Sequence, residues 1–187
     1  MEDDRILSLY WERNANAIQE TNNKYGAYCF SIANNILHSR EDSEECVNDT
    51  WYKAWNAIPP QRPVSLKMFL AKITRNIAFD KYAYYKAEKR GSGEMSLILD
   101  ELAECIASGS DVASAYEGKE LGRSINQFVQ ALPARDGNVF LRRYFFAEPA
   151  AEIGKRYGLT ENHVTVILSR VRKKLRLHLQ KEGFVGE

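Results

Sequence analysis

The sequence is poor in cysteine, histidine, proline and glycine, and each shortage excludes a class of protein. Three widely spaced cysteines, Cys29, Cys46 and Cys105, cannot form a closed disulfide framework, and they are more typical of small buried apolar residues. With three histidines and no closely spaced Cys or His pair, the sequence predicts neither a metal site nor a bound cofactor. Eleven glycines and five prolines are too few for a collagenous or low-complexity chain.

Long apolar runs are also missing. No run approaches the roughly 20 residues needed to span a bilayer, so we expect no membrane insertion. The start of the chain, at 1–4, is acidic and lacks the basic-then-apolar order of a secretion signal. A hydrophobic content of 44% and a charged content of 27% are typical of a chain that buries a core. These features predict a soluble, cytoplasmic protein.

Signatures of catalysis are absent as well. The sequence has no glycine-rich phosphate loop, no GxSxG and no HExxH. His38, His163 and His178 lie in unrelated segments, and no nucleophile is placed beside them by the sequence. We therefore expect that the protein is not an enzyme.

The near-zero net charge hides blocks of opposite sign. Twenty-six Lys and Arg residues balance 25 Asp and Glu residues, for a net charge of +1. Residues 40–49 and 94–120 are acidic, whereas 72–90 and the end of the chain are basic. Any one block could be a solvated helix face, but the alternation favours a chain whose parts meet different partners.

Apolar residues recur at helical spacing along most of the chain, and strand patterns are almost absent. Leu7, Tyr10, Trp11 and Ala15 are spaced for a single helical face. Ser43, followed by two glutamates, is typical of a helix N-cap with acidic residues in the first turn.

The helical patterns fall into two groups. Between them lies a stretch that is acidic, rich in glycine and serine, and poor in apolar residues. We predict an all-α fold with two small helical domains, at 1–90 and 115–187, joined by an acidic linker at 91–114.

The sharpest local pattern is a helix-turn-helix near the end of the chain. A short helix is expected at Ala150–Tyr157, followed by a left-handed Gly158 and by Thr160 as the cap of a long helix at Glu161–Leu179. The long helix has an apolar face made of Val164, Ile167, Leu168, Val171 and Leu175.

The opposite side of that long helix is suited to DNA. Short polar residues near its start can reach base edges in a major groove, and the cations further along suit phosphates. The alternative is a helical hairpin with a solvated cationic end, and we favour DNA binding. The outward residues are Thr160, Glu161, Asn162, His163, Thr165, Val166 and Ser169, followed by Arg170, Arg172, Lys173 and Lys174.

Two earlier segments are less distinctive. Residues 62–90 interleave cations with tyrosines, which suits an unpaired nucleic-acid strand, but the same pattern fits core tyrosines beside solvated lysines. Residues 43–58 carry Trp51 and Trp55, which favour a packing seam, opposite a polar face. That face could dock a protein, although a solvated face is the default. Its members are Glu45, Asn48, Asp49, Tyr52 and Lys53.

Together these segments resemble a known family, the sigma factors of bacterial RNA polymerase. The match is to the small two-domain, extracytoplasmic-function group of the sigma-70 family, over about 24–90 and 117–181. Ser43–Trp55 is similar to the family's polymerase-docking helix, and Phe69–Asp80 to its promoter-melting, −10-reading helix. Leu159–Leu175 is similar to its −35 recognition helix, although Thr165, Val166 and Ile167 depart from the commoner polar or basic residues.

The resemblance implies roles for particular residues. The polymerase-binding residues would be Glu45, Asn48, Asp49 and Tyr52. The −10 residues would be Arg62, Ser65, Lys67, Lys72, Arg75, Asn76 and Lys81. Of these, Lys67, Arg75 and Asn76 would hold a flipped −10 base together with the Pro59–Ser65 loop. The −35 residues would be Thr160, Glu161, Asn162, Thr165, Ser169, Arg170, Arg172 and Lys173.

The resemblance also implies partners, namely core RNA polymerase, promoter DNA and an anti-sigma factor. It implies that the acidic linker threads the polymerase near the RNA exit path. Two other functions remain open at this point. A stand-alone helix-turn-helix regulator would bind its duplex without polymerase, and a helical adaptor would bind no nucleic acid.

Overall fold

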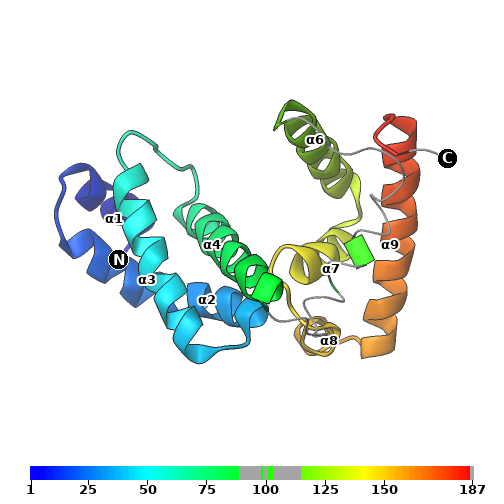
Figure 1. Cartoon of the computed structure of the whole chain (residues 1–187), viewed down its shortest axis with the longest axis horizontal. Coiled ribbons are helices and arrows are strands. Elements are labelled where there is room, and N and C mark those ends of the chain that lie inside the picture. Colours follow the sequence, from blue (N-terminus) through cyan, green and yellow to red (C-terminus); the bar gives the residue numbers. More distant parts are fainter. Residues whose placement is uncertain (89–97, 99–100, 103–114, 186–187) are drawn as a thin grey trace. The chain divides into compact units, whose positions relative to one another are not determined.

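The computed structural model describes residues 1–88, 98, 101–102 and 115–185, and each regular element within them is an α-helix. The chain divides into two compact units, Met1–Gly91 and Ser92–Glu187 (Figure 1). The predicted all-α fold class is therefore confirmed.

The first unit is built on three long helices that pack pairwise against one another, with a short helix at the start. Its fully buried core includes Ile6, Tyr10, Cys29, Ala54 and Leu70. The Tyr10 hydroxyl lies 3.0 Å from the Thr21 hydroxyl, so this buried polar group is hydrogen-bonded. The helices are α1 (Asp3–Trp11), α2 (Asn16–Leu37), α3 (Arg40–Ala57) and α4 (Leu66–Glu88).

The predicted cap of α3 at Ser43 is wrong. The helix begins at Arg40, because Ser39 is the residue whose side chain accepts a hydrogen bond from the backbone N–H of Asp42. Ser43 is buried inside α3, and its hydroxyl donates to the backbone oxygen of Ser39. His38, with a φ of 51°, ends α2 just before this cap, so the new helix starts one turn earlier than expected.

The predicted single stripe through Leu7, Tyr10, Trp11 and Ala15 is also wrong in its second half. Helix α1 ends at Trp11, and Arg13 adopts a φ of 55°, which breaks the helical path before α2 begins. Leu7 and Tyr10 are buried, whereas Trp11 is 45% exposed and Ala15 is exposed.

The second unit contains the helix-turn-helix, and the predicted short helix is confirmed residue for residue. Gly158 has a φ of 65° and ends the short helix, and the Thr160 hydroxyl accepts from the His163 N–H at 3.2 Å. Figure 1 shows the short helix beside the start of the long one. The helices are α6 (Ala115–Ala131), α7 (Ala134–Tyr144), α8 (Ala150–Tyr157) and α9 (Glu161–Lys181).

The apolar face predicted for the long helix is buried at each of its positions from Val164 to Leu175. Of the predicted linker, Ile98, Glu101 and Leu102 are described, and they belong to the second unit. The rest of 91–114, including Cys105, lies outside the described residues. Cys29 and Cys46 are buried free thiols, as expected for small apolar residues.

Candidate nucleic-acid and polymerase interfaces

The start of α9 presents a polar surface. Thr160, Glu161, Asn162 and Thr165 are exposed, and Ser169 is half-buried. Two of the hydroxyls are used inside the helix, since Thr160 caps it and Thr165 donates to the backbone oxygen of Glu161 at 3.0 Å. The exposed Asn162 amide is therefore the best placed of these groups to read a base edge.

The cations further along α9 divide into two kinds. Lys173 and Lys174 are exposed and line a hollow of about 390 Å³ with Val166. Arg170 is held by a carboxylate, because its Nη2 lies 2.7 Å from Asp136 Oδ2. Arg172 is also held, since its Nη1 donates to the Tyr144 hydroxyl at 2.8 Å.

Three carboxylates of the second unit each contact two arginines. The groups are Asp136 with Arg135 and Arg170, Glu148 with Arg142 and Arg156, and Glu101 with Arg143 and Arg172. Asp136 and Glu148 are buried, and one oxygen of each lacks a hydrogen bond within the described chain. Sequence reasoning missed these groups because each group that holds Arg170, Arg172 or Arg143 joins residues that are far apart along the chain.

The start of α4 and the loop before it carry the exposed −10 candidates. Arg62, Ser65 and Lys67 are exposed, and the Ser65 hydroxyl accepts from the Met68 N–H at 3.4 Å, which caps the helix. Val64 is fully exposed in the same loop, although the sequence reasoning did not single it out. The loop therefore offers an apolar side chain among polar ones.

Lys72 and Asn76, one turn apart on α4, line the same pocket. The pocket has a volume of about 540 Å³ and a wall that includes Phe69 and Ile73 of α4 and Lys53 of α3. The hollow thus combines an aromatic ring, a cation and an amide, which are the kinds of group that contact unstacked bases in other proteins.

Two other cations of α4, Arg75 and Lys67, lie over aromatic rings. The Arg75 guanidinium lies 4.5 Å from the centre of the Phe79 ring, and burial lowers the pKa of Arg75. Lys67 Nζ lies 4.9 Å from the centre of the Tyr28 ring. Of these two residues, Lys67 is exposed and Arg75 is half-buried.

The polymerase candidates lie along one side of α3. Glu45, Asn48 and Tyr52 follow at helical spacing and are exposed, with Tyr52 at 70%, while Asp49 is half-buried. Asn48 also borders a hollow of about 260 Å³ that is lined by Phe30 of α2. This side of α3 is thus a polar and aromatic surface open to a partner.

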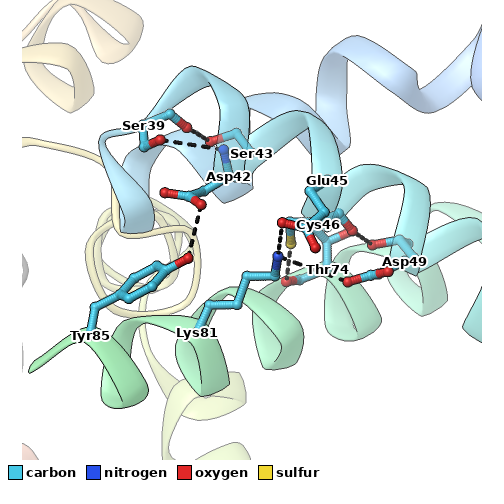
Figure 2. A network of polar contacts seen from close by, with 10 residues as sticks. Ser39, Asp42, Ser43, Glu45, Cys46, Asp49, Thr74, Lys81 and Tyr85 are labelled. Atoms are coloured by element: carbon cyan, nitrogen blue, oxygen red, sulfur yellow. Dashed lines mark hydrogen bonds and ion pairs between the residues drawn. The ribbon is translucent and has the colours of Figure 1, made fainter. Parts of the chain in front are cut away.

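Polar contacts join α3 to α4 at the edge of that surface (Figure 2). Lys81 Nζ lies 2.7 Å from Glu45 Oε2 and 4.0 Å from Asp49 Oδ2. Burial alone would lower the pKa of Lys81, but the hydrogen bond and charge of Glu45 raise it. Tyr85 donates to Asp42 at 2.9 Å, and this bond raises the pKa of Tyr85.

Beneath these ion pairs the two helices are joined by buried hydroxyls. Thr50 and Thr74 are fully buried, and their hydroxyl oxygens are 3.1 Å apart. The Cys46 thiol donates to the Thr74 backbone oxygen. Figure 2 shows Cys46 and Thr74 in the same α3–α4 interface as Lys81.

Family models match both units. Sigma-70 region 2 matches residues 23–90, and sigma-70 region 4 matches residues 129–177. The chain belongs to the sigma-70 family. No curated protein matches it closely enough to add to this assignment.

Membership gives the sigma factor its general role, which is promoter recognition in transcription initiation. Sigma factors are non-catalytic, and their region 2 and region 4 domains imply interaction with core RNA polymerase and promoter DNA. The −10 and polymerase candidates all fall within the region 2 match, and the −35 candidates all fall within the region 4 match.

Among its described residues, the sigma factor has neither a metal-binding cluster nor a membrane-spanning helix. Within the part of the chain that the structure describes, no cluster of three or more His, Cys, Asp or Glu residues could hold a metal ion. None of the described helices is long and apolar enough to cross a bilayer.

Proposed function

We propose that the chain is an extracytoplasmic-function sigma factor that directs core RNA polymerase to specific promoters and helps to open the −10 region. The observation that carries this proposal is the pairing of a region 2 unit that has a pocket lined by Phe69, Lys72 and Asn76 with a region 4 unit that has an exposed polar helix start. The protein would act in the cytoplasm, where core polymerase is found, and the family expectation of an anti-sigma partner belongs to the same proposal.

The −10 role rests on the pocket beside α4. Lys72 and Asn76 would hold a base that has left the duplex, and Phe69 would stack against it. Arg62 and Lys67, which come shortly before Phe69 in the sequence, are exposed. They would contact the phosphates of the unpaired strand. Binding energy of this kind would offset the cost of unpairing the −10 bases.

The −35 role rests on α9. Asn162 at its exposed start would read a base edge, and Lys173 would contact a phosphate. The hydroxyls of Thr160 and Thr165 form hydrogen bonds within the first turns of α9. These two residues would therefore contact the groove mainly through van der Waals contacts rather than hydrogen bonds to bases.

The polymerase role rests on the exposed side of α3. Asn48 and Tyr52 offer hydrogen bonds and an aromatic ring, which protein interfaces favour. Glu45 and Asp49 would add charge complementarity to a basic partner surface.

Opening of the promoter is the step that tests this proposal. Chain and core polymerase together should make −10 thymines reactive to permanganate on a cognate promoter, and neither should do so alone. Asn76→Ala should reduce that reactivity while leaving −35 protection in place. Strong sequence-specific duplex binding by the chain alone, with no core-dependent opening, would instead identify a stand-alone regulator.

A further inference from the structure

Within the second unit, Arg143, Tyr144 and Arg172 converge on the carboxylate of Glu101. The Tyr144 hydroxyl donates to Glu101 Oε2 at 2.8 Å and accepts from Arg172 Nη1 at 2.8 Å. Arg143 Nη2 lies 3.3 Å from Glu101 Oε1, and Arg172 Nη1 lies 3.2 Å from Glu101 Oε2. The Arg143 side chain is 3% exposed, and those of Glu101 and Arg172 are 19% and 20% exposed, so the site is partly screened from water.

Glu101 differs from the other two carboxylates that hold arginine pairs. Asp136 lies in α7 and Glu148 directly before α8, both inside the region 4 match at 129–177. Glu101 comes from the stretch before α6, outside that match. Ile98, three residues earlier in the sequence, is 1% exposed.

The charges explain why the site needs an occupant. One carboxylate faces two guanidinium groups, and loss of the carboxylate would leave Arg143 buried beside a second cation, which is strongly unfavourable. A phosphate offers guanidinium groups the same paired oxygens as a carboxylate.

We propose that Arg143, Tyr144 and Arg172 form an anion cradle that Glu101 fills in the free chain and that a DNA backbone phosphate fills when Glu101 is displaced. This inference rests on the proposed −35 role of α9. Arg172 would contact a phosphate only after Glu101 is displaced. The contact with Glu101 would therefore lower the DNA affinity of the free chain.

The test uses the full chain without polymerase and a short random-sequence duplex, followed by fluorescence anisotropy at several salt concentrations. Glu101→Gln should bind about threefold or more tightly than the wild type, with a salt slope steeper by about one unit. Glu182→Gln removes the same charge at the exposed end of α9 and should change neither quantity. In an Arg172→Gln background, Glu101→Gln should bring no gain.

Equal affinity of Glu101→Gln and wild type would overturn the proposal, as would an equal gain in Glu182→Gln or in the Arg172→Gln background. If Glu101→Gln does not fold, hydrogen exchange of the wild type decides. Saturating duplex should speed exchange at the amides of Ile98 and Glu101, and unchanged exchange would overturn the proposal. Neither assay needs a promoter or polymerase. A failure of this proposal can therefore be told apart from a failure of the proposed sigma factor function in transcription.

Discussion

Lys81 Nζ in α4 lies 2.7 Å from a carboxylate oxygen of Glu45 in α3. The lysine is a proposed −10 contact, and the glutamate is a proposed polymerase contact. The two proposed surfaces of region 2 therefore meet along the α3–α4 interface, where Asp49 also approaches the lysine (Figure 2).

Lys81→Met should leave the fold nearly unchanged. The Lys81 side chain is 18% exposed, but its partner Glu45 is 63% exposed, and an ion pair with one partner so open to water contributes less than about 1 kcal/mol. Urea unfolding should therefore shift by no more than that amount, while core-dependent transcription falls. The control is Lys24→Met, which breaks the 2.7 Å ion pair between Lys24 of α2 and Asp3 of α1. It should change the free energy of unfolding as little as Lys81→Met does, and it should leave core-dependent transcription unchanged. A larger loss of stability in Lys81→Met alone would make this lysine chiefly structural.

Gly154→Ala should destabilise the helix-turn-helix. A Cβ at this position would lie 2.6 Å from the backbone oxygen of Leu159, so the turn before α9 must shift, at a cost of about 1–3 kcal/mol. Thermal unfolding should show the loss, and −35 binding by the holoenzyme should weaken with it.

Gly122→Ala is the matched control in α6. Nothing lies within 4 Å of its added Cβ, so the change should stabilise the helix by about 0.5–1 kcal/mol. Equal effects of the two substitutions would contradict the close approach at Gly154.

Asn162→Ala and Lys173→Gln should affect the holoenzyme differently. Loss of the Asn162 amide should cost about 1–3 kcal/mol on the preferred −35 duplex and relax the base preference at one position. Loss of the Lys173 charge should weaken all duplexes alike and lower the salt slope by about one unit. Competition binding across −35 variants measures both effects, and interchanged results would contradict the placement of these residues.

Much of the second unit could be predicted from the sequence because its signals are local. Gly158 and Thr160 end one helix and start the next within a few residues, and the apolar spacing from Val164 onward fixes the buried face. The start of α3 was mispredicted because Ser39 and Ser43 are both good caps, and the left-handed His38 selects the first.

The sites were harder to predict because they depend on contacts between distant residues. Charge and spacing marked Arg170 and Arg172 as phosphate contacts, but nothing near them in sequence shows that Asp136 and Glu101 hold them. The pocket lined by Lys72 and Asn76 of α4 is also lined by Lys53 of α3, so it depends on how the two helices pack.

Cys29 and Cys46 should resist alkylation in the native protein. Burial raises the pKa of Cys29 to about 11 and that of Cys46 to about 12, so thiolate is scarce at neutral pH. The native state keeps these protons after the unfolded chain has lost them, so stability should decline as pH rises above about 9. Mass spectrometry after iodoacetamide treatment should find both residues unmodified until urea is added. Modification of either at neutral pH in the native state would contradict their burial.

Run-off transcription with purified bacterial core polymerase on a promoter library tests the central claim most directly. The account predicts defined transcripts only when chain and core are both present, from promoters that share −35 and −10 motifs. Asn48→Ala with Asp49→Ala should weaken core binding and reduce those transcripts without unfolding the chain. The absence of any chain-dependent transcript from a competent core polymerase would contradict the account.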